Sequence, residues 1–170
     1  PQTPVIMHIA SDHNISLICY NFALYKHMIK FVLLVNKLGQ TRIAQYYFEM
    51  PREERKTLES ELVRKCLSRS PEKCFAIPHL NYKIVFRRYA SLYFIFGIDE
   101  NEENEMQYYV LIHRFVQILD KYFENVCELD IMFNLDKVYY VLEEVIQNGD
   151  VVDNNEKSIL GPVHVLDNAN

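Results

Sequence analysis

The stretch Asn125-Val126-Cys127-Glu128-Leu129-Asp130-Ile131-Met132-Phe133-Asn134 joins two strongly apolar helical segments, one ending near Val126 and one beginning near Glu128. Glu128 and Asp130 suit the first turn of the second helix, because a helix N-terminus favours negative charge. The apolar side chains between them indicate close packing at the junction. From composition alone, the stretch is most simply a helix–helix corner with a packed core.

The composition bounds the class of protein. The 170 residues suffice for one domain, and a hydrophobic content of 49% supports a real core. The net charge of −5 gives no broad basic field, so we expect no nucleic-acid partner. No apolar run reaches the ~18 residues that a membrane span needs. We therefore expect any membrane association to be peripheral or through partners.

Cysteine and histidine offer little chemistry in this sequence. The four cysteines, at positions 19, 66, 74 and 127, and the six histidines show no nucleophile or metal-ligand spacing. We predict no catalytic residue, no cofactor and no metal site, and we interpret Cys127 as a small buried packing residue. A small cytosolic thiol-dependent enzyme, with Cys127 as its nucleophile, is the enzymatic alternative.

Apolar periodicity predicts the order of the elements. Two nearly continuous apolar runs, Phe31–Val35 and Leu92–Ile98, are typical of strands buried on both faces. The remaining predictions are strands at 41–48, 74–77 and 82–87, and a helix from Pro51 to about Ser68. Pro78 suggests that the third strand ends there or lies at an edge. The order strand-strand-helix-strand-strand-strand-helix-helix predicts an α+β domain with helices on a five-stranded antiparallel sheet.

The helix predicted from about Glu105 to Val126 is apolar over much of its circumference. Two adjacent stripes follow helical spacing: Tyr109, Ile112, Val116, Leu119, Phe123 and Val126, and Tyr108, Leu111, Phe115, Ile118 and Tyr122. A surface helix usually needs only one apolar face. We expect the second stripe to be covered either by the next helix, which ends at a Gly149 C-cap, or by a permanent protein partner. A short final segment, 157–167, is interpreted as helical before Gly161-Pro162.

The junction stretch resembles the signature of the sigma (small) subunits of clathrin-adaptor-type vesicle coat complexes. Further matches are Met28-Ile29-Lys30-Phe31, Gly39-Gln40-Thr41-Arg42, the run from Asn81 to Phe94, and Leu135-Asp136-Lys137-Val138. Within the family, the stretches Lys65–Ser70, Asn104-Glu105-Met106 and Ile131–Lys137 are most similar to the sigma subunit of adaptor complex four. Pro78-His79 and the acidic loop 99–105 depart from the usual pattern, so their loops are not transferred.

The resemblance sets the domain boundaries and the fold. The family's usual start corresponds to Met28. We interpret 1–27 as an N-terminal extension, disordered or an artefact of the gene model, and 28–168 as a longin/SNARE-like domain. No basic segment precedes the apolar stretch Ile15–Tyr25, so a secretory signal is a poor fit.

The resemblance also implies a function. It predicts a non-enzymatic small subunit of a heterotetrameric adaptor complex for vesicle-mediated protein transport, at the cytoplasmic face of trans-Golgi network or endosomal membranes. A large, epsilon-type subunit would be its direct partner, beta and medium subunits would complete the core, and an Arf-type GTPase would contact mainly other subunits. The alternative is a coatomer zeta-type or other longin-domain trafficking scaffold that binds no cargo.

Sigma subunits of this family recognise acidic dileucine sorting signals together with the large subunit. The resemblance implies that Arg42 contacts the acidic residue of the signal. It implies a leucine pocket formed by Ala90, Leu92, Val116, Asn125, Val126, Leu129 and Ile131. We expect this pocket where the fifth strand, the long helix and the junction stretch meet.

Overall fold

The computed structural model describes residues 28–69, 76–153 and 155–168, so the predicted extension 1–27 lies outside the described residues. The elements, in chain order, are β1 (Ile29–Asn36), β2 (Thr41–Tyr46), α2 (Arg52–Leu67), β3 (Ala76–His79), β4 (Tyr82–Tyr89), β5 (Leu92–Asp99), α3 (Glu105–Phe123), α4 (Glu128–Phe133), α5 (Leu135–Val145), β6 (Ile146–Gln147), β7 (Asp150–Val151) and α6 (Glu156–Asn168).

The main sheet has five strands in the order β2-β1-β5-β4-β3, and every neighbouring pair is antiparallel. The predicted α+β class with a five-stranded antiparallel sheet is therefore confirmed. β5 is the central strand and β1 lies beside it, away from the edges, which agrees with their continuous apolar sequences. β3, which contains Pro78, lies at one edge, where a residue without an N–H donor is tolerated.

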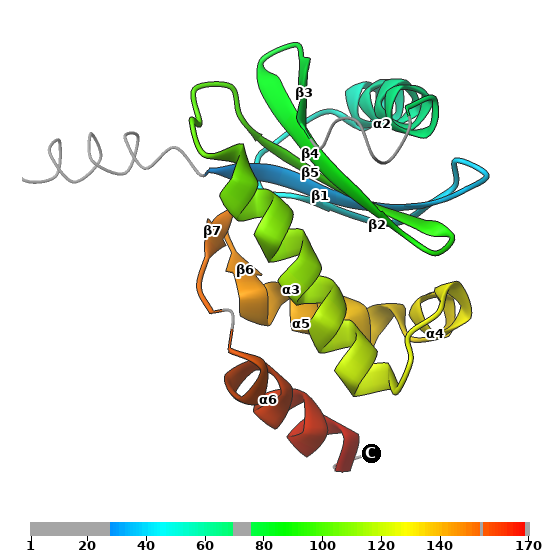
Figure 1. Cartoon of the computed structure of the whole chain (residues 1–170), viewed down its shortest axis with the longest axis vertical. Coiled ribbons are helices and arrows are strands. Elements are labelled where there is room, and N and C mark those ends of the chain that lie inside the picture. Colours follow the sequence, from blue (N-terminus) through cyan, green and yellow to red (C-terminus); the bar gives the residue numbers. More distant parts are fainter. Residues whose placement is uncertain (1–27, 70–75, 154, 169–170) are drawn as a thin grey trace, which may run out of the picture.

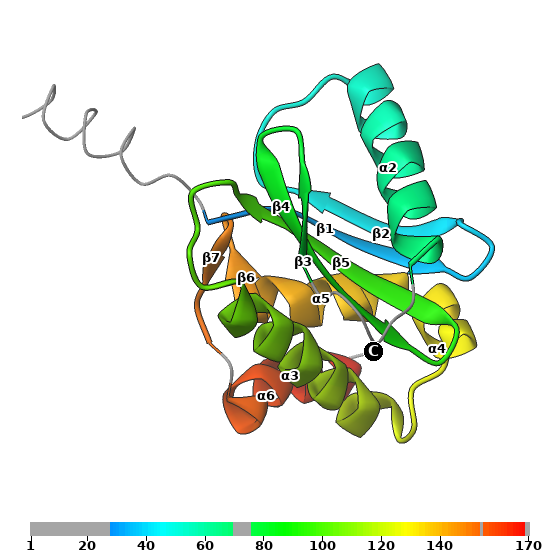
Figure 2. The ribbon, with the colours of Figure 1, turned by 45° about the horizontal axis from the view of Figure 1, so that its top comes forward.

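Helices cover both faces of the sheet, with α2 on one face and α3 and α5 on the other (Figures 1 and 2). Alternate side chains of β1 point to opposite faces, so Phe31, Leu33 and Val35 pack under α2. Val32 and Leu34 join the larger core beneath α3 and α5. α6 packs against α3 and α5 on the side away from the sheet.

Gly97 allows one close approach within the sheet. It lies opposite Phe31 in the β1–β5 pairing, and a Cβ atom at this position would clash with the Phe31 ring. Phe31 is fully buried and packs edge-on against Tyr82, with 5.6 Å between the ring centroids. The absence of a side chain at Gly97 therefore makes room for a large aromatic ring in the smaller core.

The helix predicted to follow the junction is two helices. α4 ends at Phe133, and Asn134 has φ −130° and ψ 44°, which interrupts the helical backbone before α5 begins. The Asn134 side chain donates a hydrogen bond from Nδ2 to the Asp130 carbonyl at 2.8 Å, which satisfies a carbonyl of the last turn of α4. α4 and α5 are therefore two separate helices rather than one continuous helix.

Two predictions at the C-terminal end are wrong. Gly149 is not a C-cap: Asn148 and Gly149 have φ values of 56° and 86° and form the turn of the β6–β7 hairpin. Asn-Gly favours this kind of turn because both central residues take positive φ. α6 runs through Gly161-Pro162 to Asn168 instead of ending before them. Its buried Ile159, Leu160 and Val163 stabilise it against the larger core despite the proline.

Candidate functional site

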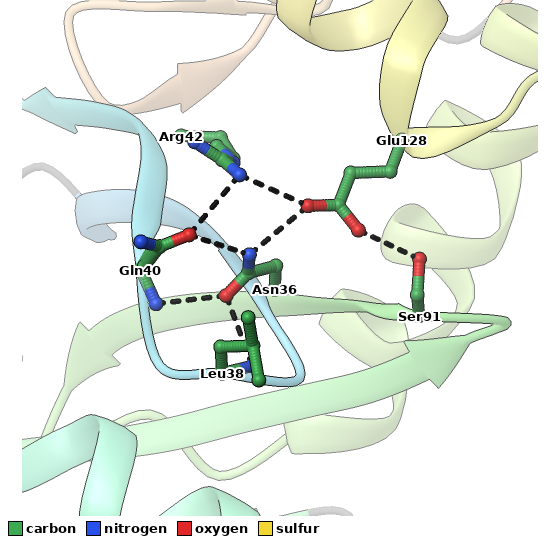
Figure 3. Close-up of polar contacts among 6 residues, drawn as sticks. All are labelled: Asn36, Leu38, Gln40, Arg42, Ser91 and Glu128. Atoms are coloured by element: carbon green, nitrogen blue, oxygen red, sulfur yellow. Dashed lines mark hydrogen bonds and ion pairs between the residues drawn. The ribbon is translucent and has the colours of Figure 1, made fainter.

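A polar cluster forms where α4 meets the turns of two β-hairpins (Figure 3). Glu128, the first residue of α4, accepts hydrogen bonds at Oε1 from Asn36 Nδ2 at 3.0 Å and from Arg42 Nη2 at 3.2 Å. Its Oε2 accepts a hydrogen bond from Ser91 Oγ at 3.0 Å. Asn36 ends β1, Arg42 lies on β2, and Ser91 lies in the β4–β5 turn. The Glu128 carboxylate thus links α4 to the β1–β2 hairpin and to the β4–β5 turn, which are far apart in sequence.

The β1–β2 turn is organised by Asn36. Its Oδ1 accepts the backbone N–H groups of Leu38 and Gln40, at 3.0 Å and 2.9 Å. Gln40 Oε1 in turn accepts hydrogen bonds from Asn36 Nδ2 at 3.0 Å and from Arg42 Nη2 at 3.2 Å. Gly39 supplies the positive φ, 83°, that the turn needs. The turn therefore presents Arg42 to Glu128 in a defined position.

The cluster contains a matched pair of charges. Hydrogen bonds from Asn36, Ser91 and Arg42 hold the pKa of Glu128 below its usual value, so the carboxylate is ionised at neutral pH. The side chains of Arg42 and Glu128 are 25% and 22% exposed. Among the described residues, Arg42 Nε is a buried donor without a hydrogen-bond partner. The guanidinium thus has a paired Nη2 and an unpaired Nε.

The predicted leucine pocket divides into a buried part and a surface part. Leu92, Val116 and Ile131 are 5%, 9% and 0% exposed, and all belong to the larger core. Val126 is half-buried and packs against that core. Ala90, Asn125 and Leu129 are exposed, Leu129 by 57%. Three of the predicted pocket residues are thus core residues, and Leu129, directly after Glu128, is an exposed apolar member.

Unusual backbone conformations shape this corner. Glu124 and Asn125 take φ values of 53° and 84° at the end of α3. Asp120 accepts hydrogen bonds from two backbone N–H groups where the chain turns: its carbonyl accepts the Asn125 N–H at 3.1 Å, and its Oδ1 accepts the Val126 N–H at 3.1 Å. Ala90 takes φ 49° in the β4–β5 turn. Small or polar residues tolerate these conformations better than β-branched residues.

The prediction that Cys127 is buried is wrong. Its side chain is exposed, whereas Cys66 is buried. Cys127 is the N-cap residue of α4, and its backbone N–H donates to Asp130 Oδ2 at 2.8 Å. This is half of a capping box, in which an acidic residue three positions into the helix satisfies the N-cap backbone. The N-cap position at the corner, rather than core packing, accounts for the exposure of Cys127.

A second surface feature is a groove of about 1130 Å³ beside the N-terminal half of α3. Met28, Met106, Val110 and Val151 line it and are 41–56% exposed. The sheet, α5 and α6 all contact α3, which accounts for most of its two apolar stripes. We call this feature the α3 groove. It marks the part of α3 that the described chain leaves apolar and open.

The structure adds two negative findings. Among the described residues, no group of three or more His, Cys, Asp or Glu side chains is placed to hold a metal ion. No helix in the described part of the chain is long and apolar enough to cross a membrane.

Asn36, Gln40, Ser91 and Glu128 were not predicted as site residues. Gln40 stands in the quoted Gly39–Arg42 motif, and Glu128 in the junction stretch, but the sequence offers no sign that they meet. The Arg42–Glu128 contact spans 86 positions. Only the fold brings these positions together, since nothing local links the two segments.

Comparison with known proteins identifies relatives over most of the chain. The family model described as "Clathrin adaptor complex small chain" matches residues 28–170. The AP-4 complex subunit sigma of Arabidopsis thaliana is 52% identical over 141 residues, which cover 83% of this chain and 98% of that protein. The AP-4 complex subunit sigma-1 of Homo sapiens is 49% identical over 140 residues, covering 82% of this chain and 96% of that protein.

A solved-structure comparison agrees with these relatives. A chain of a homology model of the full-length AP-3 complex in a stretched open conformation matches with a TM-score of 0.67 and 30% sequence identity. The match covers 84% of this chain and 95% of that chain. The five-stranded sheet and its helices thus have a counterpart in an adaptor complex.

Proposed function

The chain belongs to the clathrin adaptor complex small chain family, and we propose that it helps a complex of the AP-4 type to recognise acidic dileucine sorting signals on transmembrane cargo. As a member of this family it is a small subunit of an adaptor complex in vesicle trafficking, and it partners other adaptor subunits in a heterotetramer. The proposal concerns which complex, which surface and which signal.

The assignment to an AP-4-type complex is supported by the AP-4 sigma relatives from a plant and a mammal, at 52% and 49% identity. The direct partner would then be a large epsilon-type subunit, with beta and medium subunits completing the core. Recruitment to trans-Golgi network or endosomal membranes would depend on an Arf-type GTPase that contacts mainly the other subunits.

The observation that supports signal recognition is the position of Arg42 beside the first turn of α4. Arg42 contacts Glu128, and the next residue, Leu129, is 57% exposed. Ser91, which also contacts Glu128, directly precedes Leu92. Through Glu128, Arg42 is therefore one contact away from two segments that carry proposed pocket residues, α4 with Leu129 and the start of β5 with Leu92. In one extended peptide, an acidic residue would contact Arg42 and a leucine pair would contact the proposed pocket.

The expected affinity is modest. Burying two leucines contributes roughly 1.5 to 3 kcal/mol each, and a partly exposed ion pair adds about 1 kcal/mol or less. Association costs offset much of this gain. We expect a dissociation constant on the order of micromolar or weaker. Several complexes on one membrane would raise the effective affinity through avidity.

The α3 groove is proposed as a contact with the large subunit. Its four exposed apolar side chains, Met28, Met106, Val110 and Val151, lie together on one surface. A heterotetramer needs an interface that stays buried, and such interfaces are more apolar than ordinary surface. An apolar helix of the large subunit fits this surface. Val110→Asp should then weaken assembly while leaving the fold intact.

Co-expression tests the partner assignment. The full chain would be expressed with the large-subunit trunk of each adaptor complex from the same source, and assembly would be measured by gel filtration. We expect a stable one-to-one complex with the epsilon-type trunk. A folded monomer that ignores every trunk would contradict the proposal and favour a coatomer zeta-type or other longin-domain scaffold.

Peptide binding tests the cargo assignment. The assembled complex should bind a fluorescent acidic dileucine peptide, and a peptide with both leucines changed to serine should not compete. Equal binding of the two peptides would contradict the proposed leucine pocket. The thiol-enzyme alternative has lost its support, because the relatives are adaptor subunits rather than enzymes.

A further inference from the structure

The carboxylate of Glu128 stands where the acidic residue of a signal would be expected. Arg42 Nη2 lies 3.2 Å from Glu128 Oε1, and the carboxylate also accepts hydrogen bonds from Asn36 and Ser91. We propose that Glu128 is a specificity-determining residue, an internal carboxylate with which the acidic residue of a sorting signal competes for Arg42. The inference rests on the proposed recognition of acidic dileucine signals and deepens it.

The local charges show why Glu128 matters for specificity. Arg42 and Glu128 neutralise each other at a distance of 3.2 Å. A second carboxylate that approaches the guanidinium is attracted by Arg42 and repelled, from a somewhat longer distance, by Glu128, so the repulsion offsets a large part of the attraction. The acidic residue of a signal therefore adds little affinity while Glu128 is in place. Removing the Glu128 charge leaves the attraction alone.

The donors of Arg42 differ in their access to a signal. Its Nε is a buried donor without a hydrogen-bond partner in the described part of the chain. A guanidinium can serve two carboxylates through different edges. Because Nε is buried, a signal carboxylate cannot reach it from solvent in this arrangement, so the signal must compete with Glu128 for the Nη edge of the guanidinium.

The same carboxylate links the charge to the leucine pocket. Glu128 is the first residue of α4, and Leu129 and Ile131 follow on the same helix. Its contacts with Asn36, Arg42 and Ser91 hold α4 against both hairpin turns. An acid that draws Arg42 away loosens one of these contacts close to the leucine-binding side chains.

A purely structural role for Glu128 makes a different prediction. If the carboxylate only holds α4 in place, its loss should weaken binding of acidic and neutral dileucine peptides alike. If it competes for Arg42, its loss should strengthen binding of the acidic peptide selectively. The ratio of the two affinities separates these roles, because a general change in the pocket leaves the ratio unchanged.

The test uses the chain assembled with its large subunit and two fluorescent dileucine peptides, one with Glu and one with Gln at the acidic position. Anisotropy gives the dissociation constant of each. In the wild type we expect the Glu peptide to bind no more than about twofold tighter. In Glu128→Gln, which keeps the side-chain shape, we expect the Glu peptide to bind up to about fivefold tighter than the Gln peptide, the upper range for one exposed ion pair. Thermal unfolding checks that the variant is folded.

A matched control is Glu124→Gln. Glu124 is exposed at the end of α3, near the same corner, and the substitution removes the same charge. In this variant we expect the same ratio of Glu-peptide to Gln-peptide affinity as in the wild type. A rise in this control equal to that in Glu128→Gln would overturn the proposal, because it would show a general charge effect.

A second variant covers a failure of Glu128→Gln to assemble. Glu128→Asp keeps the charge that favours the first turn of a helix but withdraws the carboxylate from Arg42 by one methylene. We expect a ratio between the wild-type value and fivefold. An unchanged ratio in the variants that assemble would overturn the competition while leaving signal recognition intact. No binding of either peptide to any form would overturn both.

Discussion

The proposed signal site has two halves: an acid half, which is Arg42 with its polar neighbours, and a leucine half. The side chains of the two halves differ in their exposure to solvent. The acid half is satisfied by exchangeable contacts, since Arg42 and Glu128 are 25% and 22% exposed. In the leucine half, Leu92, Val116 and Ile131 are at most 9% exposed. Water can replace the contacts of the first half, whereas a signal leucine can reach Leu92, Val116 and Ile131 only if the side chains that cover them move.

This difference separates stability from recognition. Changes in the acid half should alter selectivity with little effect on folding, because partly exposed ion pairs contribute about 1 kcal/mol or less. Changes in the buried leucine half should affect folding first. Within the leucine half, the exposed Leu129 is the position where binding can be tested without a large loss of stability.

The largest expected effect is that of Val116→Asp. Val116 is 9% exposed within the larger core, so the substitution places an unpaired carboxylate in an apolar environment. We expect the free energy of unfolding of the full chain to fall by about 3 kcal/mol or more, measured by urea denaturation. Any loss of peptide binding in this variant would then report folding as well as contact.

Val110→Asp is the matched control on the same helix. Val110 is 56% exposed, so the same substitution should change the free energy of unfolding by no more than about 0.5 kcal/mol. Similar losses in the two variants would mean that Val116 is not part of the folded core.

Leu129→Ser should affect binding rather than folding. Leu129 is 57% exposed on α4, so we expect stability to change by about 0.5 kcal/mol or less. If Leu129 contacts a signal leucine, the loss of that contact should weaken the dileucine peptide by about tenfold in the assembled complex. Phe133→Ser, at another exposed apolar position on α4, should leave the affinity unchanged. Equal effects would indicate a general role of α4.

The sheet was the part of the fold most accessible from sequence. β1 and β5 are nearly continuous apolar runs, and β3 carries a proline that predicts an edge. The break at Asn134 escaped prediction because neither Gly nor Pro marks it. The β6–β7 hairpin was missed because two-residue strands leave no periodic pattern, so Asn148-Gly149 could be taken for a helix end.

The site was accessible only through the resemblance, and only in part. Arg42 and the proposed leucine-pocket residues were identified from family motifs, not from periodicity. The pairing of Arg42 with Glu128 was missed because the two residues are 86 positions apart and belong to different motifs. First-turn carboxylates are common at helix N-termini, so Glu128 had an adequate local explanation. Its long-range role depends on how both hairpin turns meet α4.

A double-mutant cycle tests whether Arg42 and Glu128 act together on peptide affinity, with a smaller expected effect than that of Leu129→Ser. Arg42→Gln leaves Glu128 to repel a signal carboxylate, so the Glu peptide should bind about fivefold weaker than in the wild type, and the Gln peptide should not change. Combining it with Glu128→Gln should return both peptides to similar affinities. Independent effects of the two substitutions would argue against a shared interaction.

The smallest expected effect concerns acid stability. Hydrogen bonds from Asn36, Ser91 and Arg42 lower the pKa of folded Glu128 below the reference value of 4.5. A carboxylate whose pKa is lower in the folded state contributes stability that is fully present above the unfolded pKa. That contribution is lost as the pH falls through the folded pKa. The urea midpoint of the wild type should therefore fall more steeply below pH 4.5 than that of Glu128→Gln. Glu124→Gln, which leaves these hydrogen bonds in place, should keep the wild-type slope. Parallel curves for the wild type and Glu128→Gln would mean that the cluster does not hold the Glu128 carboxylate in solution, and the acid half would then be open to a signal without competition.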